Sequence, residues 1–204
     1  MLLAAVLALT PQAFSEVVID TYNSGASSET FAIRTVDTAF NTANNTAVSF
    51  SVGTMQVAAS TLPVANRFAR VSYAWGGGDE PFLGLDRFLA FDVVSAVGDW
   101  VVTMTYDGLG GTGADGVVVG TINNLDSGIV SFDLATGGNT GHLNGLQNLQ
   151  LQFENTTAGS LGNRVLTLNS LAAVPEPSSI ALLGLTGLGG VVVARRRKRV
   201  QEIV

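Results

Sequence analysis

The chain contains no cysteine and a single histidine, His142, among its 204 residues. The lack of cysteine excludes disulfides, a thiol nucleophile and cysteine-ligated zinc, and one histidine cannot form a cluster of zinc ligands. His142 lies in the polar segment 139–145, and the chain has no Gly-x-Ser-x-Gly motif. A Ser-His-Asp site is therefore not expected. We interpret His142 as a residue of a surface loop.

Charged side chains are scarce, at 13% of residues, and they are unevenly distributed. Residues 1–174 carry fourteen acidic and five basic side chains, a net of −9, and residues 175–204 carry two acidic and five basic, a net of +3, which together give the formal charge of −6. An acidic body repels phosphate backbones, so we expect no nucleic-acid partner. Low charge combined with 24 glycines is typical of short strands and many turns.

Helical periodicity is nearly absent between residues 16 and 173, and the best helix candidate, 57–62, is short and is stopped by Pro63. Segments rich in β-forming residues recur instead, separated by Gly, Asn and Asp clusters. In 100–106 and 149–154, side chains alternate between two faces. The predicted strands are 17–20, 31–36, 47–56, 67–75, 87–94, 100–106, 116–123, 128–134, 149–154 and 164–171. The pattern predicts a mostly β fold, an antiparallel β-sandwich over residues 16–173.

The first nine residues form an apolar run of the length of a signal-peptide core, too short to span a bilayer. A small-x-small site follows and ends at Ser15, so we expect residues 1–15 to be removed and the mature protein to start at Glu16. No Lys or Arg precedes the run. We explain this by a start codon assigned too late; the alternative is a buried N-terminal strand or helix.

The C-terminal segment has three parts in a fixed order. The first is the motif Val174, Pro175, Glu176 and Pro177, whose prolines favour an extended, accessible chain. The second is the uncharged run 180–194, which as a helix spans about 22 Å of a hydrocarbon core about 30 Å thick. The third is the basic cluster Arg195, Arg196, Arg197, Lys198 and Arg199. Such a cluster keeps the C-terminus on the cytoplasmic side, so we predict a short transmembrane helix over 180–194.

This order of parts resembles the PEP-CTERM sorting signal, over about residues 174–200. The resemblance implies export and a transient inner-membrane intermediate. Cleavage near Pro175, Glu176 and Pro177 by an exosortase-type membrane protease would follow. It also implies delivery to the cell surface or extracellular matrix of a Gram-negative bacterium that makes exopolysaccharide and biofilm.

The last part of the body suggests a second resemblance. The predicted strand 128–134, the segment 146–153 and the predicted strand 165–171 run directly into the Pro-Glu-Pro motif. This order is similar to that of galactose-binding-like jelly rolls used as carbohydrate-binding modules. The resemblance implies a jelly-roll-like sandwich that binds sugar.

Two candidate ligand sites are predicted within the body. Tyr73 and Trp75, beside three consecutive glycines, would form an aromatic platform for sugar rings, with Asp79 or Glu80 accepting hydroxyl hydrogens. The alternative places the aromatic side chains in the core, as we expect for Trp100. Asp107 and Asp115 flank a glycine-rich loop that offers oxygen ligands to calcium. We favour the simpler interpretation of that loop as a hairpin turn.

Two functions remain open from the sequence. The first is a non-enzymatic surface or matrix protein that contacts exopolysaccharide. The alternative is a secreted glycoside hydrolase, which would need two carboxylates about 5–10 Å apart. Asp79, Glu80, Asp86, Asp92, Asp99 and Glu154 are available, and their spacing singles out no pair.

Overall fold

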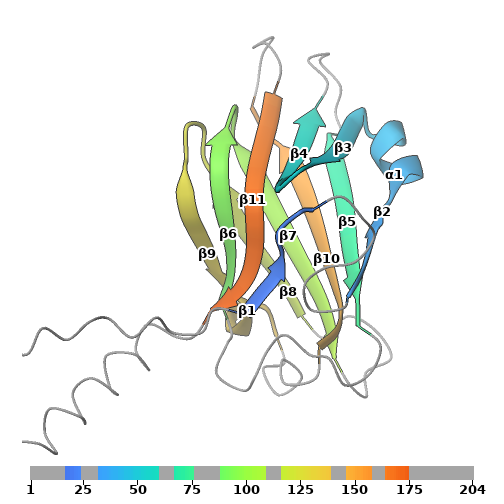
Figure 1. The fold of residues 1–204 in the computed structure, drawn as a ribbon, viewed down its shortest axis with the longest axis vertical. Helices are drawn as coiled ribbons and strands as arrows, with labels where there is room; N and C mark the ends of the chain where they lie inside the picture. Colours follow the sequence, from blue (N-terminus) through green and yellow to red (C-terminus); the bar gives the residue numbers. More distant parts are fainter. Residues whose placement is uncertain are drawn as a thin grey trace, which may run out of the picture.

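Two antiparallel β-sheets pack face to face around one core in the computed structural model (Figure 1). The structure describes residues 17–23, 32–59, 67–75, 88–108, 116–138, 146–157 and 164–174. All the strand pairs named within these ranges are antiparallel. The prediction of a mostly β, antiparallel sandwich is confirmed.

The first sheet contains six strands. Its order is β3 (Thr46–Ser51), β4 (Thr54–Ala59), β11 (Arg164–Val174), β6 (Phe88–Ala96) and β9 (Gly128–Asp133), and β1 (Val17–Asp20) also pairs with β11. β6 pairs along most of β11, whereas β4 and β1 share the opposite edge of β11. β11 is therefore the central strand of this sheet, as Figure 1 shows.

The second sheet contains five strands. Its order is β2 (Ile33–Val36), β5 (Phe68–Ala74), β10 (Leu146–Asn155), β7 (Trp100–Gly108) and β8 (Gly116–Ile122). The α-helix α1 (Thr38–Ala43) connects β2 to β3, and the 3₁₀ helix η1 (Leu134–Gly137) follows β9. Both sheets therefore contain strands that are distant in sequence.

Alternation of side chains builds the core. In β7, every second residue from Trp100 to Gly108 is buried and those between are half-buried, because successive side chains of a strand point to opposite faces. β10 alternates in the same way from Leu149 to Asn155. Trp100 is fully buried, which confirms its expected place in the core.

Two local predictions were wrong. The predicted strand 47–56 is a hairpin of β3 and β4, because Gly53 has a φ of +74° and turns the chain after Ser51. The helix candidate 57–62 is also incorrect over 57–59, which form the end of β4, where Val57 is buried in the core. The helix α1 was not predicted; it begins after Asp37, whose carboxylate accepts a hydrogen bond from Phe40 N at 3.0 Å.

One end of the sandwich holds the start of β1 and the end of β11, since Val17 pairs with Ala173. We call this the proximal end; it is the lower end in Figure 1. A bridge between Gly116 and Gly138 places the start of β8 near it, and the pairing of Gly108 with Leu146 adds the end of β7 and the start of β10. The described ends of β7 and β11 and the described starts of β1, β8 and β10 therefore lie at the proximal end.

Candidate functional site

The outward side of the second sheet carries a group of hydrogen-bonding side chains. Adjacent strands align Ser72, Gln150 and Thr105 in one row, and side chains in such rows are neighbours about 5 Å apart. The next outward row aligns Arg70, Gln152 and Thr103. We define the polar face as these six side chains together with Glu154.

All the side chains of the polar face are half-buried, whereas those between them along each strand are buried. Amide and hydroxyl groups both donate and accept hydrogen bonds, so the polar face can match a ligand that carries many hydroxyl groups. The sequence alternation in 149–154 had placed Gln150, Gln152 and Glu154 on one side. The neighbouring rows depend on strand register, which the sequence does not specify.

Arg70 is held in place at the edge of the polar face. Its guanidinium carbon lies 3.8 Å from the centroid of the Phe40 ring, and its Nη1 lies 3.6 Å from Asp37 Oδ2. Its Nη2 donates to Gln152 Oε1 at 3.3 Å. The Asn41 side chain accepts a hydrogen bond from Arg70 N at 2.7 Å, which ties α1 to β5. The face thus combines a positioned cation with an aromatic ring from α1.

Tyr73 and Trp75 do not form the expected exposed platform. Tyr73 is fully buried and Trp75 is 5% exposed, with their rings stacked at a centroid distance of 6.1 Å. Tyr73 occupies an inward position of β5, opposite Leu149, so the register directs its ring into the core. Asp79, the third member of that candidate site, lies outside the described residues.

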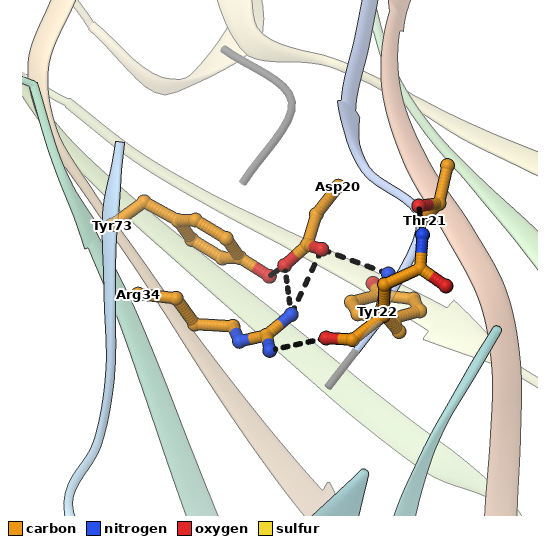
Figure 2. A network of polar contacts seen from close by, with 6 residues as sticks. Asp20, Thr21, Tyr22, Arg34 and Tyr73 are labelled. Carbon is orange, nitrogen blue, oxygen red and sulfur yellow. Dashed lines mark hydrogen bonds and ion pairs between the residues drawn. The ribbon is translucent and has the colours of Figure 1, made fainter. Parts of the chain in front are cut away.

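A polar network is buried between the two sheets beside these aromatic rings (Figure 2). Arg34 Nη1 donates to both carboxylate oxygens of Asp20, at 2.8 and 2.7 Å. The Tyr73 hydroxyl donates to Asp20 Oδ2 at 3.0 Å, and Tyr22 N donates to Asp20 Oδ1 at 2.8 Å. Arg34 Nη2 also donates to the carbonyl of Asn23 at 3.0 Å. We call this network the clamp, because it joins β1 of one sheet to β2 and β5 of the other.

The clamp is almost closed to solvent. The side chains of Arg34 and Asp20 are 2% and 1% exposed. Burial raises the pKa of the Asp20 carboxyl above its ordinary value, although Arg34, Tyr22 N and the Tyr73 hydroxyl all lower it. Burial also raises the pKa of the Tyr22 and Tyr73 hydroxyls well above the ordinary value. A network so enclosed serves packing and not ligand contact.

The calcium candidates are only partly described. Asp107 is half-buried near the end of β7, and its Oδ1 is buried without a hydrogen-bond partner, whereas Asp115 lies outside the described residues. β7 and β8 pair antiparallel on either side of the loop. Within the described ranges, no group of three or more His, Asp or Glu side chains could hold a metal ion. A calcium site here remains a prediction.

The carboxylates considered for hydrolysis are dispersed. Asp92 lies on β6 of the first sheet, where its Oδ2 accepts a hydrogen bond from Asn169 Nδ2 at 3.0 Å. Glu154 lies on the outward side of β10 in the second sheet. These two therefore belong to opposite outer faces and form no pair. Asp99 lies in the turn between β6 and β7, and Asp79, Glu80 and Asp86 fall outside the described residues.

The two end segments also lie outside the described residues. The N-terminal segment is 1–15 with the cleavage pair Ser15 and Glu16. The C-terminal segment contains the motif residues Pro175, Glu176 and Pro177, the helix predicted over 180–194 and the basic cluster 195–199. His142 also lies outside the described residues. Only Val174 of the sorting motif is described, as the last residue of β11. The described part of the chain contains no helix with the length and apolar character needed to cross a membrane.

Residues 173–198 match the PEP-CTERM protein-sorting motif. The chain carries this signal, which confirms the identification of its C-terminal segment. Proteins with this motif are exported and sorted to the cell surface. No curated protein sequence matches the chain.

Several solved structures resemble the body. The family 11 carbohydrate-binding module of the cellulosomal cellulase Lic26A-Cel5E of Clostridium thermocellum is 11% identical, with a TM-score of 0.46 over 80% of this chain and 98% of the module. PfGH50B is 13% identical with a TM-score of 0.45; the match covers 72% of this chain and 22% of PfGH50B. A non-crystalline cellulose specific module, CBM28, is 12% identical with a TM-score of 0.39, over 63% of this chain and 80% of the module. At such low values, the similarity names no ligand for this chain.

Proposed function

We propose that this chain is a non-enzymatic protein of the cell surface or extracellular matrix that binds exopolysaccharide through the polar face. The observation that carries the proposal is the alignment of Ser72, Gln150 and Thr105 beside Arg70, Gln152 and Thr103 on neighbouring strands. A polysaccharide presents rows of hydroxyl groups, and its sugar rings also have apolar faces. The polar face supplies matching donors and acceptors, and Phe40 at its edge supplies an aromatic surface.

We infer that sorting takes place in the order that the motif requires. Residues 1–15 would direct export and leave a mature start at Glu16. Residues 180–194 would then pause in the inner membrane as a helix, with 195–199 on the cytoplasmic side. An exosortase-type protease would cut near Pro175, Glu176 and Pro177 and so deliver residues 16–173 to the surface of a Gram-negative cell. The match of 173–198 to the sorting motif supports this order.

We further propose that the sandwich is jelly-roll-like. β10 lies between β5 and β7, and β11 lies between β4 and β6. The last two strands are thus inserted centrally, one into each sheet. Such nested order is the feature expected of two Greek keys that share a core, and it supports the proposal.

The test is binding of the full chain to purified exopolysaccharide and to neutral glucans by calorimetry. The double variant Gln150→Ala/Gln152→Ala should lower affinity at least about tenfold, or about 1.4 kcal/mol, because each amide loses both its donor and its acceptor. The matched control is Gln56→Ala/Ser49→Ala, a paired position on the outward side of the first sheet. Equal losses in both variants would contradict the assignment of the site, and release of sugar fragments by the wild type would favour the hydrolase.

A further inference from the structure

The end of β11 and the start of the sorting motif share residues. Ala173 and Val174 belong to β11 and also to the matched segment 173–198. Ala173 is fully buried and pairs with Val17 on one side and Leu89 on the other. While β1 pairs with one edge of this backbone, the extended cleft of a protease cannot pair with the same edge. The folded domain therefore competes with the sorting enzyme for these residues.

On one side of β11, this stretch is covered by β1. The pairing of β4 with β11 ends at Leu168, and β1 pairs with Leu171, Ala172 and Ala173. Release of β1 would free the backbone groups of these residues along one edge while β6 still holds the other. A free edge is where an extended segment of another protein can add as a strand.

The clamp fastens β1 in this position. A four-residue strand that pairs along one edge is prone to local opening, but the clamp binds Asp20 at the end of β1 to Arg34 and Tyr73 of the other sheet (Figure 2). Ile19 is fully buried as well. Detachment of β1 would leave Arg34 without its carboxylate partner in the interior, which is strongly unfavourable.

We propose that β1 is a latch that limits access of the sorting enzyme to the motif. The motif is cut slowly while β1 is docked and rapidly when β1 is released. The step is cleavage of one backbone amide bond: its acyl half passes to water or to a hydroxyl or amino acceptor of the envelope, and its amine half stays with the membrane helix. The latch rests on the proposal that a membrane enzyme cuts at this motif.

The test is a disulfide that locks the latch in the full chain, expressed in cells that contain the sorting enzyme. Val18 and Ala172 are paired residues of β1 and β11, and the chain has no other cysteine with which new thiols could pair. We expect oxidised Val18→Cys/Ala172→Cys to be processed at least about tenfold more slowly than its reduced form, because local opening of β1 is prevented. The matched control is Ala58→Cys/Val165→Cys, which joins β4 to the other end of β11 and should leave the processing rate unchanged.

Two further variants make the result decisive. A flexible six-residue insertion between Val174 and Pro175 separates the motif from the strand, and it should restore rapid processing to the oxidised protein. Equal processing of the oxidised and reduced forms without the insertion would overturn the latch. Replacement of Pro175, Glu176 and Pro177 by Ala should block cleavage in either state. If this triple variant is still cut, the proposed cleavage site is wrong, and this outcome is distinct from a failure of the latch.

Discussion

The two sheets share one core and both carry polar rows on their outer faces, but the rows of the second sheet adjoin Arg70 and Phe40. On the first sheet, one row aligns Ala172, Ala90 and Ser131, of which Ala172 and Ala90 are only 1% and 2% exposed. Another row aligns Ser49, Gln56 and Thr167. On the second sheet, Arg70, Gln152 and Thr103 align in the same manner and offer donors and acceptors. The first sheet contains both β1 and β11 and so carries the connections to both chain ends. We propose ligand contact for the second sheet because Arg70 and Phe40 adjoin its polar rows, and the polar row of the first sheet serves as the control.

The largest loss of stability is expected from a substitution in the clamp, which joins the two sheets. Arg34→Met should lower the free energy of unfolding by about 3–5 kcal/mol, because it leaves the Asp20 carboxylate buried without its cation. The matched variant Arg70→Met removes a cation whose side chain is 27% exposed and lies 3.6 Å from Asp37. It should cost about 1 kcal/mol or less. Urea unfolding at neutral pH measures the free energy of unfolding of both variants. Equal losses would contradict the distinction between the buried cation Arg34 of the clamp and the partly exposed cation Arg70 of the polar face.

The sandwich is also closed where β8 of one sheet meets β9 of the other. A Cβ atom on Gly120 would lie 2.0 Å from the ring of Phe132, so Gly120→Ala should cost about 1–3 kcal/mol of stability through overpacking. The exposed neighbour Thr121→Ala is the control and should change little. The double variant Gly120→Ala/Phe132→Ala should cost less than the sum of its single variants. Additive costs in urea unfolding would show that the two residues are not in contact.

The sequence predicted the β-sandwich and most of its strands because alternation and turn residues are local signals. It failed at Val57, whose place in β4 depends on pairing with Val48 and Leu166. It also left open whether Tyr73 and Trp75 are exposed, since a strand has the same local pattern whichever face is turned to the core. The polar face was only partly predictable. Alternation along β10 predicts that Gln150, Gln152 and Glu154 share one side, but the rows of the polar face join strands that are 30 or more residues apart in sequence. The sorting motif needed no tertiary information because the order of its three parts is local.

A smaller effect is expected at the edge of the polar face. Arg70→Lys retains the charge but loses the planar group that lies over Phe40. If the face binds exopolysaccharide, affinity should fall about threefold to tenfold, or about 0.7–1.4 kcal/mol, with stability nearly unchanged. Calorimetry on the wild type and this variant measures the change. Unaltered affinity would mean that the ligand binds away from α1, on the part of the polar face nearer to β7.

The smallest effect concerns the pH dependence of the clamp. Burial raises the folded-state pKa of Asp20 above the ordinary value of 3.8, so the folded protein binds more protons than the unfolded chain in the window directly above that value. The contribution of Asp20 to stability is therefore fully present below pH 3.8 and is lost as the pH rises through the folded-state pKa.

Since Arg34 lowers the pKa of Asp20, the variant Arg34→Met should raise this pKa further. The difference in stability between the wild type and Arg34→Met should then be smallest where Asp20 is protonated in both and should widen with increasing pH. Urea unfolding across this range, with NMR titration of the Asp20 carboxyl, measures both directions. A difference that narrows with increasing pH would mean that Arg34 does not act on Asp20 through its charge.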